Sequence, residues 1–430
     1  MKAMTDSFTR SLPGADDITR VVLENGITVL TRPNMNSQSV VISGYLPAGN
    51  MYDPLEKLGL ANFTASMLTR GSQQYSFQKF FDILESAGAT LGFGASVHNA
   101  SLGGRALAED LPLLLNLLSE CLRHPVFPAE YVERLRAQQL AGLAIRAQDT
   151  GDMASLTFDS LLFPDHPYGR PEDGYPETIR AIQREDLIAF HHRHYGPRGM
   201  VIAIVGGVEA DRAVDAVRTA LGDWTNPAQR EPGQVGEVSP LIASNRSHVP
   251  IAGKTQADLV MGSLAPRRRS PEYLAASLGN NILGQFGMMG RIGDVVREQA
   301  GLAYYASTSL NSWIVSGSWE VSAGVNPSNL NRAIDLITSE IRRFTRETVT
   351  AEELADSQSN YVGRLPLSLE SNSGVSNALL NLERFQLGLD YYRTYPDLVR
   401  AVTVEEILAV AQKFLDADRL IVVSAGPEAV

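Results

Sequence analysis

Val201-Ile202-Ala203-Ile204-Val205-Gly206 is a run of five apolar residues closed by a glycine, and Ile421-Val422-Val423-Ser424-Ala425-Gly426 follows it at a spacing of 220 residues. The same spacing separates Arg180-Ala181-Ile182 from Arg400-Ala401-Val402, and both copies continue with a glutamate and then an alanine. A short apolar run that is bounded by a glycine is typical of a buried strand. Each copy therefore predicts a helix that leads into a buried strand.

Further matches upstream extend this internal repeat. Val41–Leu46 parallels Leu259–Leu264 at a spacing of 218 residues. Between these segments and the terminal strands, Glu85–Gly88 matches Glu298–Gly301, and Leu117–Leu122 matches Leu336–Ile341. Matches that keep their order along the chain indicate a duplication. We therefore expect two homologous domains.

Within each half, strand and helix patterns occur together. Thr19–Arg32 predicts a hairpin in which Asn25-Gly26 supplies the positive φ values of a tight turn. Apolar residues then recur at helical spacing, first at Leu60, Phe63 and Met67. The fold class expected for each half is α+β, with a mainly antiparallel sheet and helices packed on one of its faces.

The domain boundaries follow from composition. The stretch from Asn226 to Ser247 is rich in Pro, Gly, Ser and Gln and shows neither helical nor strand periodicity. We expect an N-terminal domain over residues 17–224, a linker over 225–248 and a C-terminal domain over 249–430.

Length and charge exclude several classes of protein. The 430 residues carry a net charge of −11, which is unsuited to the clustered cations of a nucleic-acid surface. No apolar segment is typical of a signal peptide or long enough to cross a bilayer, so we expect a cytoplasmic protein without membrane contact. The single cysteine, Cys121, excludes an intrachain disulfide and has no metal-binding cysteine spacing around it.

Two signatures carry a family resemblance. One is Glu24-Asn25-Gly26, then Gly59, then a helix that ends near Arg70-Gly71-Ser72. The other runs from Leu283-Gly284 through Val296-Arg297-Glu298 into Gly301-Leu302-Ala303-Tyr304. From about Thr19 to the C-terminus the chain resembles the insulinase or pitrilysin family of inverted-zinc metallopeptidases, especially two-domain members such as mitochondrial processing peptidase and its bacterial relatives. The resemblance implies that the two domains form half of a clam-shell chamber.

The family's metal-binding residues are replaced in this chain. Its motif is H-x-x-E-H on a helix, in which two histidines bind zinc and the glutamate polarises a metal-bound water. The corresponding positions are Asn62, Ala65 and Ser66, and the third ligand position, counted from Glu133-Arg134, falls at or within a residue of Leu140. Asparagine and serine are poor zinc ligands, and alanine cannot accept a proton. We therefore expect no metal in this chain, with zinc in a partner subunit.

The resemblance also assigns roles to Arg297 and Tyr304. Active relatives use an arginine and a tyrosine at this spacing to hold the substrate near the zinc, and both side chains can donate hydrogen bonds to a developing oxyanion. Without the resemblance, Arg297 is a cation in the last turn of a helix, Gly301 ends that helix, and Tyr304 is a strand aromatic. Similarly, His191, His192 and His194 lie at the end of a helix that starts near Arg184, and we interpret them as structural.

Three functions stay open at this point. The first is the non-catalytic, substrate-binding subunit of a heterodimeric zinc metallopeptidase, inactive alone, which lends Arg297 and Tyr304 to a homologous subunit with an intact H-x-x-E-H motif. The second is a metal-free peptide-binding or assembly protein. The third is a self-sufficient enzyme of another chemistry, for which no nucleophile stands beside a base at recognisable spacing. In the first, the partner is a second copy of this chain if no other subunit exists.

Overall fold

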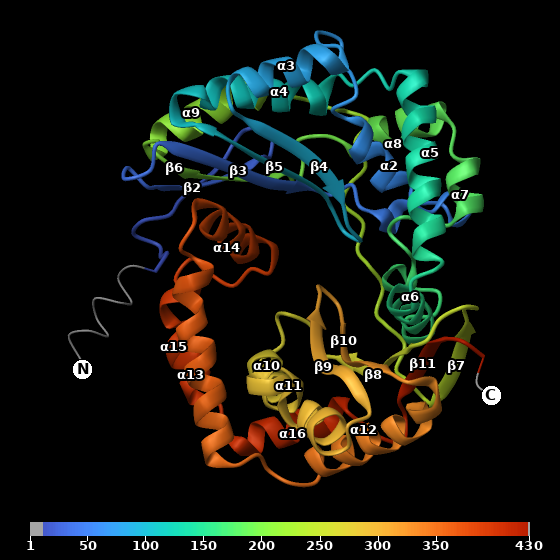
Figure 1. Ribbon diagram of the computed structural model, residues 1–430. Helices are drawn as coiled ribbons and strands as arrows, with labels where there is room; N and C mark the ends of the chain where they lie inside the picture. Colours follow the sequence, from blue (N-terminus) through green and yellow to red (C-terminus); the bar gives the residue numbers. More distant parts are fainter. Residues whose placement is uncertain (1–11, 429–430) are drawn as a thin grey trace. The chain divides into compact units, whose positions relative to one another are not determined.

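The computed structural model describes residues 12–428, which form two compact units, each built around its own sheet (Figure 1). The first unit combines the residues up to Leu143 with Pro171–Gln234 and Leu365–Thr394. The second combines Ala144–Arg170, Val235–Arg364 and the residues from Tyr395 onward. Each unit therefore contains a segment from the other half of the sequence.

The first unit holds a six-stranded sheet in the order β1-β2-β6-β3-β5-β4. Only β2 and β6 run parallel, and the other neighbouring pairs are antiparallel. The strands are β1 Thr19–Val22, β2 Thr28–Pro33, β3 Ser39–Leu46, β4 Thr90–Ala95, β5 Ala100–Leu107 and β6 Val201–Gly206. Every residue of β6 is buried, as its uninterrupted apolar sequence predicts.

The second unit repeats this arrangement with five strands in the order β7-β11-β8-β10-β9. Its one parallel pair, β7 with β11, occupies the place of β2 with β6. The strands are β7 Asn245–Pro250, β8 Ala257–Ala265, β9 Ala303–Ser312, β10 Gly317–Val325 and β11 Ile421–Gly426. The predicted α+β class with two homologous, mainly antiparallel sheets is confirmed.

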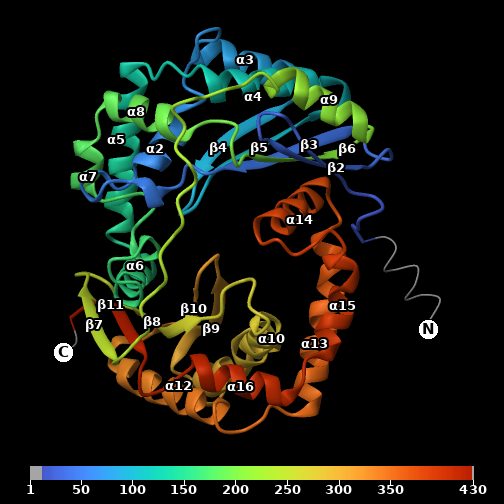
Figure 2. The same ribbon diagram turned by 180° about the vertical axis from the view of Figure 1, so that it is seen from behind.

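The helices surround these sheets, as Figures 1 and 2 show from opposite sides. Their bounds are α2 Leu60–Met67, α3 Phe77–Ser86, α4 Leu111–Arg123, α5 Ala129–Arg146, α6 Thr150–Leu162, α7 Pro176–Ala181, α8 Arg184–His194, α9 Ala210–Leu221, α10 Tyr273–Gly284, α11 Phe286–Gly293, α12 Leu330–Phe344, α13 Ala351–Ser368, α14 Asn372–Arg384, α15 Tyr391–Ala401 and α16 Val404–Phe414. No helix within residues 12–428 combines the length and apolarity needed to span a membrane.

Each sheet carries helices on both faces, which goes beyond the prediction of one covered face. Figure 1 shows α3, α4 and α9 on one side of the first sheet and α14 on the other. The apolar side of α14, with Leu379 at its centre, packs on residues of β2, β3 and β6. In the second unit, α6 lies against β8 and β11. The two halves of the chain thus exchange one helix each.

The first hairpin turns differently from the prediction. Gly26 has a φ of 92°, whereas Asn25 is not in the positive-φ region. The Gly26 N–H donates to the Leu23 carbonyl, so the loop is longer than a two-residue turn. The Asn25 side chain instead donates to the carbonyls of Leu221 and Trp224 and ties the hairpin to the end of α9.

The predicted domains 17–224 and 249–430 follow the sequence repeat, whereas the two compact units follow from packing. The predicted boundaries therefore stay a prediction. Residues 225–244 form no helix or strand. β7 begins at Asn245, within the segment that composition marks as a linker. Its polar sequence suits a strand at the edge of a sheet, where one side of the backbone has no neighbouring strand.

Candidate functional site

α2 is the helix that the family resemblance matches to the metal-binding helix, and an aspartate fixes its start. Gly59 precedes the helix with a φ of 95°. The buried carboxylate of Asp53 accepts hydrogen bonds from the backbone N–H groups of Gly59 and Ala61, at 2.9 Å each. These bonds satisfy donors that a helix start leaves unpaired, and the negative charge suits that end of the helix. Asp53 and Gly59 therefore fix where this helix begins.

Hydrogen bonds occupy the face of α2 on which zinc ligands would stand. The Asn62 amide donates to the Asp173 carboxylate at 2.7 Å, and the Ser66 hydroxyl donates to Asn62 Oδ1 at 3.3 Å. This contact confirms that positions 62 and 66 share one face, as their four-residue spacing requires. The polar atoms of these two residues are satisfied without a metal ion.

The other two positions lie in apolar packing. Ala65 is 1% exposed and belongs to the core of the first unit. Leu140, on α5, is half-buried and packs against the same core. Neither side chain can ligate a metal or move a proton.

A buried cation lies beside this helix. The Arg136 side chain, one helical turn before Leu140, is 12% exposed, and its guanidinium lies 5.6 Å from the centre of the Phe63 ring of α2. It donates to the Ile179 carbonyl at 2.5 Å and pairs with Glu133. An arginine stays positive at any physiological pH and repels a metal cation nearby.

These residues do not fit a zinc ion. Across residues 12–428, no three His, Cys, Asp or Glu side chains are grouped so that they could hold a metal. Positions 62 and 66 offer an amide and a hydroxyl, which bind zinc poorly compared with imidazole or thiolate. No reaction step through a metal held by this chain follows from the structure.

Arg297 lies in a π-helical turn, Asp294–Gln299, that follows α11. Gly301, with a φ of 61°, ends the turn, and its N–H donates to the Arg297 carbonyl while the Leu302 N–H donates to the Val296 carbonyl. This is the pattern of a glycine that ends a helix in the left-handed conformation. The Arg297 side chain is 35% exposed and pairs with Glu298 at 3.6 Å. Such an exposed ion pair is weak, so the guanidinium is available to a ligand.

Tyr304 stands near the start of β9, the edge strand of the second sheet, and is 85% exposed. Within the described part of the chain, its hydroxyl has no hydrogen-bond partner. The adjacent Tyr305 differs, because its hydroxyl donates to Asp258 at 2.8 Å, and burial raises its pKa together with that carboxylate. Tyrosine is enriched among the residues that contribute most to binding at interfaces. Arg297 and Tyr304 thus present two hydrogen-bond donors from one short segment.

The glycines of this signature allow a close approach of the backbone. A Cβ atom on Gly284 would lie 2.4 Å from Thr308 Cγ2 of β9. At Gly290, where φ is 63°, it would lie 2.6 Å from the Gly284 nitrogen. The side chain of Arg291 then fixes the segment through two hydrogen bonds to Glu353, at 2.7 and 2.6 Å. Burial raises the pKa of Glu353, but hydrogen bonds from Arg291 and Thr350 and the charge of Arg291 together lower that pKa to about 2.

His191 and His194 of α8 pack against other side chains and backbone of the first unit, whereas His192 is exposed. His191 contacts the Leu122 carbonyl through Nε2 at 2.9 Å and stacks on Tyr195. His194 stacks on Tyr52 and Phe190. Burial lowers the pKa of both imidazoles to about 4, so they are neutral at pH 7.

Sequence reasoning did not find the partners of these positions. Asp173 and Arg136 are remote in sequence from α2 and belong to no motif, so only the fold brings them to it. The hydrogen bond from Tyr305 to Asp258 could not be predicted from the sequence either. Alternation along β9 could, however, have predicted that Tyr304 and Tyr305 point to opposite faces of the sheet.

Comparison with known proteins supports one family for both halves. The sequence pattern described as Insulinase (Peptidase family M16) matches residues 28–152. The pattern described as Peptidase M16 inactive domain matches residues 181–361. Together they cover most of the chain.

Individual relatives agree with these patterns. An uncharacterised zinc protease of Mycobacterium tuberculosis is 27% identical over 401 residues, which is 92% of this chain and 90% of that protein. The crystal structure of a peptidase M16 inactive domain from Pseudomonas fluorescens is 27% identical, with a TM-score of 0.88 over 96% of this chain and 98% of that one. A protease from Helicobacter pylori shares the fold at 17% identity, with a TM-score of 0.89 over 97% and 100% of the two chains. The chain therefore belongs to the insulinase family, peptidase family M16, in which it resembles a non-catalytic member.

Proposed function

We propose that this chain is the substrate-binding, non-catalytic subunit of a zinc metallopeptidase made of two homologous subunits. The partner carries an intact H-x-x-E-H motif and supplies the zinc and the general base, and the complex cleaves peptides or unfolded segments. The likeness to a peptidase M16 inactive domain and to zinc proteases supports this proposal. The occupied face of α2 supports it too, because Asn62, Ser66 and Asp173 satisfy one another.

The observation that carries the proposal is that one short segment presents the exposed phenol of Tyr304 and the weakly paired guanidinium of Arg297. Peptide hydrolysis places negative charge on the carbonyl oxygen of the scissile bond. A phenol and a guanidinium that are already positioned stabilise this charge better than water does, because they need not reorganise. We infer that these two side chains donate to that oxygen, or hold the peptide carbonyls next to it, at the partner's zinc site.

The test uses the purified partner and this chain, alone and mixed, with a set of fluorogenic peptides. The mixture should cleave where each subunit alone does not. Arg297→Ala and Tyr304→Phe should each lower kcat by about 10²–10³-fold, the usual loss for one oxyanion donor. Tyr305→Phe is the matched control, since it removes a neighbouring hydroxyl that is bonded to Asp258, and it should leave kcat unchanged. Wild-type turnover in both Arg297→Ala and Tyr304→Phe complexes, with assembly intact, would refute the role of these donors.

The isolated chain should bind no stoichiometric zinc and cleave no peptide. Asn62, Ser66 and Leu140 replace three ligands and Ala65 replaces the base, so no high-affinity donor set exists at these positions. Elemental analysis after dialysis against a weak chelator measures the zinc content directly. Close to one zinc per chain, removable only by a strong chelator, would contradict the proposal.

A second candidate is a metal-free peptide-binding or assembly protein. The satisfied hydrogen bonds on α2 favour it equally, since they need neither metal nor partner. A neighbouring reading frame that encodes a homologue with H-x-x-E-H would favour the peptidase subunit. If no such homologue exists, a second copy of this chain is the remaining partner, and the scaffold function becomes the better proposal.

A further inference from the structure

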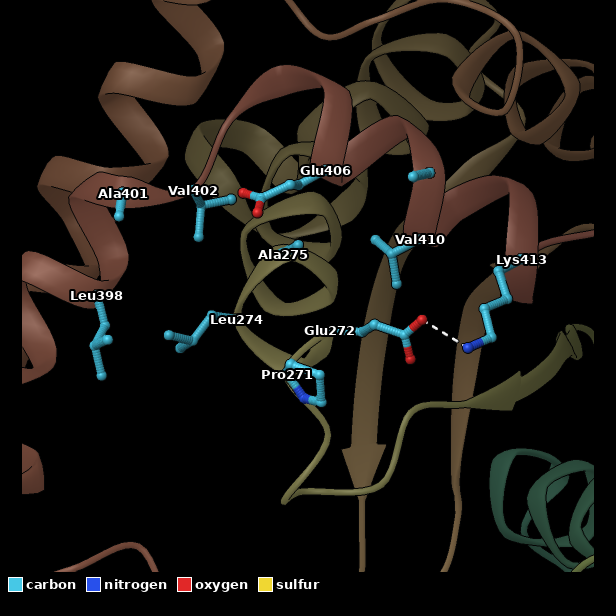
Figure 3. A pocket seen from close by; sticks show the side chains of 11 residues that line it. Pro271, Glu272, Leu274, Ala275, Leu398, Ala401, Val402, Glu406, Val410 and Lys413 are labelled. Atoms are coloured by element: carbon cyan, nitrogen blue, oxygen red, sulfur yellow. Dashed lines mark hydrogen bonds and ion pairs between the residues drawn. The ribbon is translucent and has the colours of Figure 1, made fainter.

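A pocket of about 500 Å³ opens in the second unit where α10, α15 and α16 meet (Figure 3). Leu274 and Ala275 line it from α10, Leu398 from α15, and Val402 and Val410 from the segment around α16. Its polar groups are the carboxylate of Glu406 and an ion pair at 2.6 Å between Glu272 and Lys413, drawn as a dashed line in the figure. The pocket is thus apolar with a carboxylate at its edge, a composition common in ligand sites.

The internal repeat gives this corner a counterpart in the first unit. At the spacing of 220 residues, α7 and α8 correspond to α15 and α16. Both α8 and α16 begin with a capping box, formed by Gln183 and Asp186 in one copy and by Thr403 and Glu406 in the other. The pocket residues Leu398, Val402 and Glu406 therefore stand where Thr178, Ile182 and Asp186 stand in the first unit.

In the first unit a loop of the same chain covers this corner. The Lys57 ammonium donates to Asp186 Oδ1 at 2.6 Å. The Thr178 hydroxyl donates to the carbonyl of the next residue, Leu58, at 2.8 Å. Leu58 itself is 7% exposed. The 3₁₀ turn Leu55–Lys57 and the buried Leu58 that follows it therefore place a basic side chain and a backbone carbonyl against the corner.

The capping carboxylates Asp186 and Glu406 differ in their hydrogen-bond partners. Asp186 uses one oxygen for the Gln183 N–H, at 2.7 Å, and the other for Lys57. Glu406 uses Oε2 for the Thr403 N–H, at 2.9 Å. Within residues 12–428, its second oxygen has neither a hydrogen bond nor an ion pair. Lys57 pairs with the capping carboxylate in the first unit, and no described cation pairs with its counterpart Glu406 in the second unit.

The lengths of two connections explain this difference. β3 ends at Leu46 and α2 begins at Leu60, which leaves room for the loop that carries Lys57. β8 ends at Ala265 and α10 begins at Tyr273, so the connection in the second unit is about half as long as that in the first. Leu398, the counterpart of the buried Thr178, is 42% exposed as a result. The second unit thus has the counterparts of both helices and of the capping carboxylate, but no counterpart of the loop that carries Lys57.

We propose that this pocket binds a short peptide segment in which a lysine or arginine stands next to a leucine-sized residue. The basic group pairs with Glu406, and the apolar side chain packs on Leu398 and Val402. Glu272 and Lys413 neutralise each other, so Glu406 leaves the pocket with a net negative charge that favours a cation. The site takes its peptide from another molecule and is independent of the roles of Arg297 and Tyr304.

The probe is the peptide that the first unit itself uses, acetyl-Asp-Pro-Leu-Glu-Lys-Leu-Gly-amide, the sequence of Asp53–Gly59. A second peptide has glutamine in place of lysine. Binding to the purified full chain is measured by calorimetry at low salt and again at 0.5 M salt. No partner or activity is needed, so the result is separate from the test of the proposed function.

Three variants dissect the site. Glu406→Gln removes the charge and keeps the cap, since glutamine serves in a capping box. Glu405→Gln is its matched control, an exposed carboxylate on the same turn that does not line the pocket. Ala409→Trp fills the pocket from an exposed position of α16 and leaves the helix free to form.

We expect the lysine peptide to bind saturably and the glutamine peptide to bind about threefold to fivefold more weakly, as an exposed ion pair predicts. Glu406→Gln should abolish that difference, Glu405→Gln should preserve it, and Ala409→Trp should weaken both peptides at least tenfold. No saturable binding up to millimolar peptide would overturn the proposal. Equal affinity of the two peptides for the wild-type chain, or unchanged binding to Ala409→Trp, would overturn it as well.

Discussion

Tyr304 and Tyr305 are neighbours on one edge strand, yet their hydroxyls have opposite surroundings. Tyr305 donates to Asp258, which also accepts from Thr150 of α6 and from Gln256. Tyr304 is exposed to solvent. A buried hydrogen bond to a carboxylate stabilises the fold, whereas a free phenol contributes nothing to it. The fold therefore explains Tyr305, and Tyr304 is available for the role in binding that we propose.

This difference predicts that substitution of the two tyrosines changes stability by different amounts. Tyr305→Phe removes a donor from the buried Asp258 carboxylate and should lower the free energy of unfolding by about 1–2 kcal/mol. Tyr304→Phe should change it by less than about 0.5 kcal/mol. Urea unfolding of the isolated chain measures both. A destabilised Tyr304→Phe variant would mean that its hydroxyl has a structural role.

Restoring the metal ligands tests how much of the site remains. Asn62→His, Ala65→Glu, Ser66→His and Leu140→Glu together should produce only weak zinc binding. Ala65 is 1% exposed, so a glutamate there loses its hydration, and Arg136 adds an unfavourable charge beside the helix.

The contribution of Arg136 can be measured separately. Adding Arg136→Gln to the four substitutions should strengthen zinc binding about tenfold, because it removes the cation. Calorimetric titration with zinc compares the two variants. High affinity and full peptidase activity in the fourfold variant would instead show that the site was lost recently and only at these positions.

At the scale of single elements, the positions of helices were easier to predict from the sequence than their packing partners. α8 begins at Arg184 as expected, because a capping pattern precedes its apolar positions. An amphipathic pattern such as that of α14 does not say which sheet a helix covers. For the same reason the histidines of α8 looked like helix-end cations. Their burial depends on Tyr52, Phe190 and Tyr195, which only the fold brings into contact with them.

The neutral histidines predict a loss of stability in mild acid. The pKa of His194 is about 4 in the folded chain, against an ordinary value of 6.5. Between these values the unfolded chain takes up a proton and the folded chain does not. The free energy of unfolding is therefore fully retained above pH 6.5 and falls as the pH drops towards 4, by about 1–2 kcal/mol at pH 5 for this one group.

A variant separates this effect from general acid sensitivity. His194→Phe keeps a ring between Tyr52 and Phe190 and cannot titrate, so its stability should depend less on pH between 6.5 and 5. His192→Gln, an exposed position on the same helix, should keep the wild-type dependence. Denaturant unfolding at half-unit pH steps compares the three proteins. Identical slopes for all three would rule out His194 as the source.

At the scale of the whole molecule, the repeat predicted both sheets, because buried strands such as β6 and β11 keep their apolar pattern after duplication. The exchange of α6 and α14 was not predictable from it. Both helices lie outside the matched segments, and their assignment to a sheet depends on chain paths through α5 and α13 that no local pattern encodes. The fold class was therefore accessible from sequence, whereas the composition of each unit was not.

This exchange predicts how the chain behaves when it is divided. A cut between Gln234 and Val235, in a stretch without helix or strand, leaves α14 on one fragment and its sheet on the other. Co-expressed fragments 1–234 and 235–430 should therefore copurify in 1 M salt, since the contacts that join them are apolar. Leu379→Asp places a charge in the buried face of α14 and should abolish copurification, whereas Leu367→Asp, at a residue that is 71% exposed, should not. Fragments that fold separately, with native near-ultraviolet circular dichroism and no affinity for each other, would show that neither exchanged helix is needed by its sheet.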